Sequence, residues 1–194
     1  MTQVLSPTPE ALALASQLLH DGQLVAFPTE TVYGLGANAL DAKAVLNIFA
    51  AKGRPADNPL IVHVYDRAQL TPLCEVSPLA EKLMDAFWPG PLTLILPEAR
   101  GVAANLIPEE GTLGIRIADH EFCKRLIRKL RKPLVSTSAN ITGQPTPATF
   151  SEISKEIVDG VDLVIDPQFD EHPTHKASSI LMVGIDGEIK IIRA

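Results

Sequence analysis

Predicted helices and short apolar runs alternate along almost the whole 194-residue chain. This alternation is the strongest constraint on the fold, because strands separated by helices form a sheet whose faces the helices cover. Helices are expected to begin at Thr8-Pro9, Asp41, Ser77-Pro78, Asp119 and Thr149, where capping residues precede apolar residues at helical spacing. The strand candidates are Gln23–Phe27, Leu60–Val64, Leu92–Leu96, Thr112–Ile117, Pro133–Ser136, Val161–Ile165, Ser179–Ile185 and Glu188–Ile192.

The two C-terminal strand candidates flank the dipeptide Asp186-Gly187. Such a dipeptide accepts the positive φ angles of a tight hairpin, so these strands are expected to pair antiparallel. The sequence therefore predicts an α/β fold of the α+β type, with a twisted mixed β-sheet flanked by helices. No repeat, low-complexity tract or linker divides the chain, so we expect a single domain over residues 1–194.

The chain is acidic overall, with 17 Lys and Arg residues against 23 Asp and Glu residues and a formal charge of −6. This balance excludes a protein that coats DNA without regard to sequence, because such a protein needs surplus cations for the phosphates. The basic segment 124–132 is a local exception. It is either the solvated face of a helix or a surface that contacts RNA.

Cysteine spacing and hydropathy bear on the compartment of the protein. Cys74 and Cys123 have neither metal-binding nor redox spacing, which is typical of two reduced core thiols. No apolar run approaches the roughly 18 residues that a membrane-spanning helix needs. We therefore expect a cytoplasmic protein without a membrane partner.

A polar segment from Pro28 to Gly36 follows the first predicted strand. It joins small and acidic polar residues to two glycines, which permit close backbone approach. Polar loops after strands often bind ligands, but many of them only turn the chain. The segment is therefore either a ligand-binding loop or an ordinary turn.

Two cations and a histidine lie around the next predicted strand. An extended loop would point Lys52 and Arg54 the same way, toward a shared anion. Arginine offers a planar fork to phosphate or carboxylate, and lysine offers a point charge. His63 interrupts the apolar strand and is either a satisfied core residue or a ligand contact.

Alternation along the predicted strand near residue 136 would place Ser136, Ser138 and Asn140 on one side. These side chains would form a row of hydrogen-bonding groups, or else a polar exit into a turn. The segment 170–175 contains two histidines and two acidic residues but no further ligand group, so we expect no metal held by the protein.

Four motifs follow one another in order. They are Pro28-Thr-Glu-Thr-Val-Tyr-Gly-Leu-Gly36, Lys52-Gly-Arg-Pro-Ala-Asp-Asn-Pro-Leu-Ile-Val-His63, Trp88-Pro-Gly-Pro-Leu-Thr93 and Ser136-Thr-Ser-Ala-Asn140. Together they resemble the YrdC-like threonylcarbamoyl-AMP synthase family, over about residues 22–193. The chain looks like the short form, without the extra C-terminal domain of the longer branch. The resemblance implies a YrdC-like fold with a concave basic cavity.

The resemblance also implies an activity. L-threonine, bicarbonate and ATP would give threonylcarbamoyl-AMP and pyrophosphate, and a downstream threonylcarbamoyl transferase would use the product to modify tRNA. Mg²⁺ would be held mainly by the ATP phosphates, with no organic cofactor. Because no nucleophilic side-chain arrangement is evident, positioning and charge stabilisation would carry the reaction.

Residue roles follow from the same resemblance. It assigns L-threonine binding to Thr31, His63, Arg116, Ser136 and Ser178. It assigns ATP binding to Lys52, Arg54, Asn58, Thr112, Ser138, Asn140, Thr146 and Arg193, with Lys52 and Arg54 as the catalytic cations. The chain departs from the family pattern at 176–179, just before the predicted hairpin, and at Ala118, where proline is frequent.

Two alternative functions stay open. One is an RNA-binding YrdC-like module without synthase activity, in which the segment 124–132 forms the rim of the binding surface and contacts tRNA or double-stranded RNA. The other is a carbamoyl-adenylate enzyme like those fused within hydrogenase-maturation carbamoyltransferases. Those proteins carry paired Cys-x-x-Cys motifs, which this chain lacks.

Overall fold

The computed structural model of the protein describes residues 2–55, 60–167 and 173–194. Its strands are β1 (Gln3–Leu5), β2 (Val25–Phe27), β3 (Gly34–Asn38), β4 (Ile61–His63), β5 (Leu92–Leu96), β6 (Leu113–Arg116), β7 (Leu134–Ser138), β8 (Leu163–Ile165), β9 (Ser179–Val183) and β10 (Ile189–Arg193). They form one 10-stranded sheet in the order β1-β8-β2-β3-β7-β4-β6-β5-β9-β10. Parallel pairs, such as β4 with β6, and antiparallel pairs, such as β3 with β7, both occur, so the predicted mixed sheet is confirmed.

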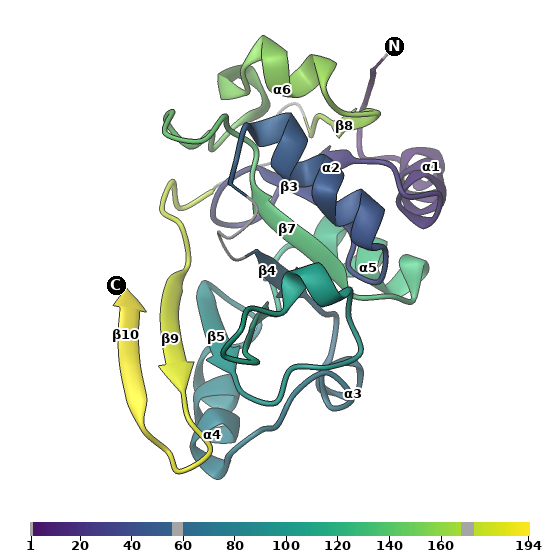
Figure 1. Cartoon of the computed structure of the whole chain (residues 1–194). Coiled ribbons are helices and arrows are strands. Elements are labelled where there is room, and N and C mark those ends of the chain that lie inside the picture. The colour runs from purple at the N-terminus through teal and green to yellow at the C-terminus, as the bar shows by residue number, and fades with distance from the viewer. Residues whose placement is uncertain (1, 56–59, 168–172) are drawn as a thin grey trace.

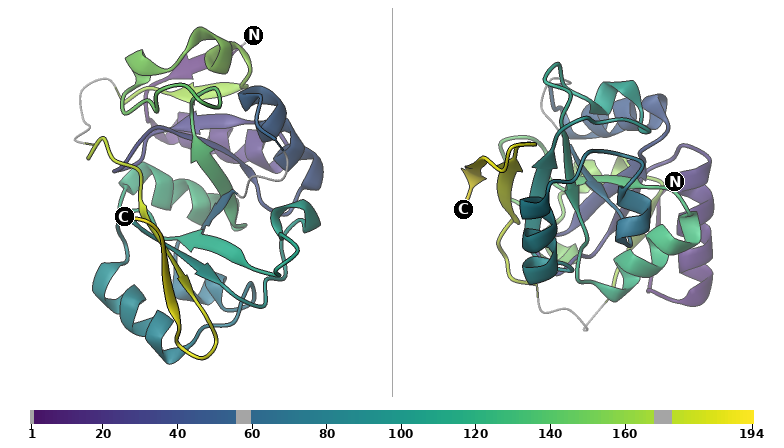
Figure 2. Two further views of the ribbon diagram at one scale, coloured as in Figure 1. Left: turned by 60° about the vertical axis from the view of Figure 1, so that its left-hand side comes forward. Right: turned by 90° about the horizontal axis from the view of Figure 1, so that it is seen from below.

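Helices flank this sheet (Figure 1). They are α1 (Pro9–His20), α2 (Ala42–Lys52), α3 (Arg67–Leu70), α4 (Pro78–Phe87), α5 (Glu121–Leu130) and α6 (Lys155–Asp159), with short 3-10 turns η1 (Ala104–Leu106) and η2 (Phe150–Glu152). The β9–β10 hairpin stands at the sheet edge opposite β1, beside β5 (Figure 2). None of the described helices is long and apolar enough to cross a bilayer.

Three helices begin where their capping residues predict. The side chains of Thr8, Asp41 and Ser77 accept hydrogen bonds from backbone amides in the first turns of α1, α2 and α4. Such caps satisfy amide groups that have no partner within the helix. The predicted start of α5 at Asp119 is wrong, because Asp119 binds the Lys124 ammonium at 3.1 Å and His120 occupies the cap position.

The predicted helix after Thr149 is divided in two. Thr149 and Glu152 do form the predicted capping box, but it encloses only the 3-10 turn η2. Ile153 then takes an extended backbone, with ψ of 127°, and Ser154 caps the separate helix α6. A single helix is therefore replaced by a turn and a short helix.

All eight predicted strands are present, and the structure adds β1 and β3. β3 lies within the glycine-containing segment, whose interpretation as a loop is wrong from Gly34 onward. A Cβ atom at Gly36 would lie 2.6 Å from Phe27 Cε1 and 3.2 Å from the Val135 carbonyl oxygen. The glycines of β3 therefore let an aromatic ring of β2 pack across the neighbouring strand.

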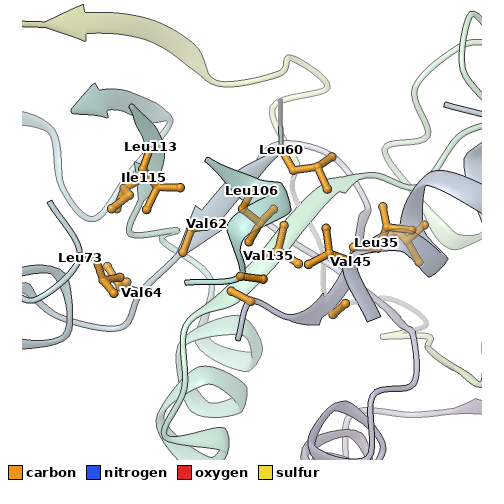
Figure 3. Close-up of a cluster of buried hydrophobic side chains, with 14 of the residues drawn as sticks. Leu35, Val45, Leu60, Val62, Val64, Leu73, Leu106, Leu113, Ile115 and Val135 are labelled. Carbon is orange, nitrogen blue, oxygen red and sulfur yellow. The ribbon is translucent and has the colours of Figure 1, made fainter. Parts of the chain in front are cut away.

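Alternating side chains send apolar residues to both faces of the sheet. On one face Val62, Ile115 and Val135 belong to a large buried cluster (Figure 3). On the other face, Phe27 and Leu134 join α1 and α5 in a second cluster. Successive residues of a strand point to opposite faces. The residues next to Val62, Ile115 and Val135 in sequence therefore lie on the same face of the sheet as α5.

Lys52 ends α2 and binds the exit of β7 instead of pointing along an extended loop. Its ammonium donates to the carbonyl oxygens of Ser138 and Asn140, the latter at 2.6 Å, and the side chain is 1% exposed. Gly53 follows in a left-handed conformation that ends the helix. The predicted extended loop is therefore wrong at Lys52, which belongs to α2. Both cations still reach the end of β7, where an Arg54 Nη lies 3.4 Å from Thr137 Oγ1.

A substitution at Gly36 tests the packing of β3. We expect Gly36→Ala to lower the free energy of unfolding by about 1–3 kcal/mol, because the added methyl overlaps the buried Phe27 ring. Gly114→Ala is the matched control, since its Cβ meets only ordinary contacts of 3.8–3.9 Å. Urea unfolding measures both changes, and equal stabilities of the two variants would contradict this packing.

The buried ammonium of Lys52 predicts a pH dependence of stability. Burial, and secondarily the charge of Arg54, lower the pKa of Lys52 to about 8 from its usual 10.5. Between these values the unfolded chain binds more protons than the folded one, so stability should rise with pH. The unfolding free energy should increase relative to that of Lys52→Met by up to about 1.4 kcal/mol per pH unit.

The control for this experiment is Lys43→Met, which changes an exposed lysine near the start of the same helix. Its unfolding free energy should follow that of the unsubstituted protein from pH 8 to pH 10. The unfolding free energy of the unsubstituted protein minus that of Lys52→Met should rise over this range. If this difference stays constant or falls, the folded state does not disfavour the ammonium.

Candidate active site

A cavity of about 710 Å³ opens on the face of the sheet that α5 partly covers. Its lining includes most of the residues to which the family resemblance assigns a role. They are Thr31, Arg54, His63, Thr112, Arg116, Ser136, Ser138, Thr146, Ser178 and Arg193. Known ligand sites enclose roughly 300–1,000 Å³, so this cavity has the size of a site for small molecules.

Strand alternation places these side chains in the cavity. His63 on β4, Arg116 on β6 and Ser136 on β7 line it, whereas their neighbours Val62 and Ile115 point into the opposite core. His63 is in register with Arg116 across the parallel pair β4–β6, so the two side chains are neighbours on one face. The β9–β10 hairpin adds further lining residues, among them Arg193.

Arg116 is a buried cation with three partners inside the protein. Its Nε donates to the Gly90 carbonyl at 3.1 Å, one Nη donates to Thr31 Oγ1 at 3.1 Å, and the other forms an ion pair with Glu30. Burying a charge is costly unless it is paired and hydrogen-bonded. These partners fix the guanidinium plane while Arg116 still lines the cavity.

Hydroxyl groups are fixed beside Arg116. Thr29 Oγ1 lies 3.0 Å from Thr31 Oγ1 and donates to the Val32 carbonyl at 2.6 Å, which closes a tight turn after β2. Across the cavity, Ser178 Oγ lies 2.8 Å from Thr93 Oγ1. These bonds hold small polar groups in place within the cavity wall.

Arginines from two other segments supply positive charge. Arg193 Nε donates to the Ser178 carbonyl at 2.8 Å, and its pKa is lowered by burial and by the charge of Arg116. Arg54 places an Nη 3.4 Å from Thr137 Oγ1, and burial lowers its pKa. The acidic residue Glu110 also lines the cavity. The basic character of the cavity as a whole therefore stays a prediction.

Two of the expected site residues lie outside the lining, and a third cannot be placed. Lys52 is turned toward the carbonyls at the end of β7. The Asn140 amide donates to the carbonyls of Ile141 and Gln144, because β7 ends at Ser138 and alternation does not continue to residue 140. Asn58 lies outside the described residues, as do residues 170–172 of the segment 170–175.

Several residues of the site were missed at the level of sequence. Thr93 ends the motif Trp88–Thr93 and lines the cavity. Nothing in the sequence around it distinguishes its hydroxyl group as a site residue. Glu30 was also within a motif, but its pairing with Arg116 depends on the fold. Lys190 reaches the cavity from the predicted C-terminal hairpin, and Glu110 reaches it from a segment without a recognisable pattern.

The basic helix α5 does not contribute its cations to this cavity. Arg125 pairs with Glu121 at 3.0 Å, Lys124 pairs with Asp119, and Arg128 lies 5.7 Å from the centre of the Tyr65 ring. No Lys or Arg residue of α5 is among those that line the described cavity. The basic segment is therefore separate from the candidate site.

Comparisons with known proteins agree with this geometry. A family model described as "Telomere recombination" (Sua5, YciO and YrdC) matches residues 17–194. A threonylcarbamoyl-AMP synthase of Pyrococcus abyssi is 45% identical over 80% of this chain and 46% of its own length. One of Bacillus subtilis is 42% identical over 86% of this chain and 49% of its own length.

A solved structure is also similar. The crystal structure of P. abyssi Sua5 complexed with L-threonine superposes with a TM-score of 0.85 at 38% identity, covering 94% of this chain and 54% of that one. The chain thus spans about half the length of these relatives. Because the family model matches nearly the whole sequence, the chain belongs to the Sua5, YciO and YrdC family.

Proposed function

We propose that this chain is an L-threonylcarbamoyladenylate synthase, a nucleotidyltransferase that uses L-threonine, bicarbonate and ATP. The observation that carries the proposal is the shared cavity, which brings the residues assigned to threonine and most of those assigned to ATP together. Its volume of about 710 Å³ is large enough for an amino acid beside a nucleotide. The names of the P. abyssi and B. subtilis relatives support the same activity.

Arg116 binds the carboxylate of threonine in this proposal. Guanidinium and carboxylate form paired, charge-assisted hydrogen bonds, and a fixed guanidinium plane lowers the entropic cost of forming them. The contacts to Gly90 and Glu30 provide that fixed plane. Thr31, Ser136 and Ser178 offer hydroxyl groups around the remaining atoms of the amino acid.

Arg54 and Arg193 bind the triphosphate of ATP together with Thr112, Ser138 and Thr146. Cations that surround a transferring phosphoryl group stabilise the charge that develops on its oxygens. Lys52 and Asn140 lie just behind this wall, at the end of β7. Their contacts fix the segment that follows Ser138, and Lys52 contributes a charge close to the phosphates.

The reaction then needs no nucleophilic side chain. Bicarbonate takes up a proton and loses water to give carbon dioxide. The neutral amine of threonine adds to the carbon of carbon dioxide and releases a proton, which forms the carbamate. A carbamate oxygen attacks the α-phosphorus of ATP, the new O–P bond forms, and the bond to pyrophosphate breaks. Bringing the two reactants together in the correct orientation supplies much of the rate, as in other phosphoryl-type transfers.

A magnesium site made of protein side chains does not fit the described residues. They contain no group of three or more His, Cys, Asp or Glu side chains placed to hold a metal ion. We propose that Mg²⁺ enters with ATP, bound mainly by the phosphate oxygens. In this proposal the described residues of the cavity bind the nucleotide, and the metal is held through its phosphates.

The product is proposed to pass to a downstream transferase that modifies tRNA. A mixed carbamic–phosphoric anhydride is reactive, so its acceptor should receive it soon after release. Contact with RNA through α5 is the alternative function, and the exposed cations of this helix are the feature that favours it. That surface lies apart from the cavity, so the two functions can be tested separately.

Product formation tests the proposed activity. Incubation of the protein with ATP, Mg²⁺, bicarbonate and L-threonine should release pyrophosphate and form an adenylate that contains threonine. Omission of either threonine or bicarbonate should abolish both products. No turnover, together with tight RNA binding that weakens steeply with salt, would favour the RNA-binding function instead.

Substitution of Arg116 by lysine tests the carboxylate contact. Arg116→Lys keeps the charge beside Glu30 but loses the planar fork, so the KM for threonine should rise at least about tenfold. The affinity for ATP alone, measured by calorimetry, should change by less than about threefold. Thermal unfolding identifies any general loss of structure.

Arg54→Lys is the matched control, because it makes the same chemical change at a cavity-lining arginine that the proposal assigns to ATP. It should weaken ATP binding and leave the KM for threonine nearly unchanged. If Arg116→Lys and Arg54→Lys reduce the use of threonine equally, the separation of the cavity into an amino-acid end and a nucleotide end is wrong.

A further inference from the structure

His63 has a buried partner behind the cavity wall. It is the last residue of β4, lines the cavity and is 4% exposed. Its Nδ1 lies 3.7 Å from Sγ of Cys123, a fully buried residue of α5 that does not line the cavity. One ring nitrogen of His63 therefore contacts α5, while the ring itself forms part of the cavity wall.

Both members of this pair are neutral at physiological pH. Burial, and secondarily the charge of Arg116, lower the pKa of His63 to about 3. Burial raises the pKa of Cys123 to about 12, against the opposing charges of Arg116 and Lys124 and with a further increase from Glu30. The pair is accordingly a neutral imidazole beside a protonated thiol.

The direction of the hydrogen bond follows from the chemistry of the two groups. A neutral imidazole has one nitrogen that donates and one that accepts. The nitrogen of imidazole is a good hydrogen-bond acceptor, whereas the sulfur of a thiol is a weak one. The thiol proton of Cys123 should therefore point to Nδ1 of His63. The ring proton then lies on Nε2, because the nitrogen that accepts from Cys123 cannot also carry it.

We propose that Cys123 is a positioning residue that fixes this tautomer of His63, so that Nε2–H donates to the side-chain hydroxyl oxygen of the amino-acid substrate. The inference rests on the proposed function and identifies a determinant of its substrate choice. Arg116 is the neighbour of His63 across the β4–β6 pair. The proposed function assigns Arg116 to the carboxylate of threonine. The nitrogen is assigned to carbamate formation, so the hydroxyl is the side-chain group of threonine left to accept a hydrogen bond from His63.

A fixed donor at this place selects for the hydroxyl. A substrate analogue without the hydroxyl would leave a buried N–H group unpaired, and such sites reject these analogues strongly. An imidazole that exchanged between tautomers would present either a donor or an acceptor to the cavity. The thiol removes that choice before the substrate binds.

Two substitutions at Cys123 remove the thiol donor. Cys123→Ala leaves extra space and Cys123→Val adds volume, so an effect common to both comes from the lost donor and not from packing. Cys74→Ala is the matched control, since Cys74 is another buried thiol, 2% exposed, whose pKa burial raises to about 12. Cys74 does not line the cavity.

Nitrogen-15 NMR of histidine-labelled protein reports which ring nitrogen of His63 carries the proton. The unsubstituted protein and Cys74→Ala should show the Nε2–H form, and both Cys123 variants should show a mixture with the Nδ1–H form. The preference in kcat/KM for L-threonine over L-2-aminobutyrate, which lacks the hydroxyl, should fall by about threefold to tenfold in the Cys123 variants.

Two results would overturn the inference. One is an Nδ1–H form of His63 in the unsubstituted protein, and the other is an unchanged tautomer and substrate preference in both Cys123 variants. Failure of the unsubstituted protein to use threonine would contradict the proposed function and the hydroxyl contact with it. The nitrogen spectrum would then still decide the role of Cys123 in fixing the tautomer.

Discussion

The buried guanidinium of Arg116 is the interaction on which the candidate site depends. Its cost is offset by three contacts from two segments: Thr31 and Glu30 in the turn after β2, and the Gly90 carbonyl in the loop before β5. Because both segments must be in place to satisfy the cation, Arg116 links β6 to the turn after β2 and to the loop before β5. The same arrangement holds the guanidinium plane ready for a ligand carboxylate, so stability and binding share one set of bonds.

The curved sheet separates apolar packing from chemistry. Val62 and Ile115 fill the core on one face, and His63 and Arg116, one residue further along the same strands, face the cavity and α5. Cys123 of α5 lies where the apolar cover of this face ends and the cavity begins. The helix thus supports the site as well as the fold.

Much of the fold could be predicted because caps and apolar runs are local signals. Thr8, Asp41 and Ser77 mark helix starts through bonds to amides only two or three residues away. β3 was missed because its glycines carry no strand propensity, and the Phe27 ring that requires them comes from another strand. Local pattern also failed at Lys52, whose partners lie more than 80 residues away at the end of β7.

The residues of the site were predicted mainly through family motifs. The contacts between these residues and their buried partners could be seen only in the fold. Glu30 behind Arg116 and Cys123 behind His63 are examples. The most direct test is a crystal structure of the protein with L-threonine and a non-hydrolysable ATP analogue. The account predicts the threonine carboxylate within hydrogen-bond distance of Arg116 and the triphosphate at Arg54. Threonine bound outside this cavity, or with its carboxylate away from Arg116, would contradict it.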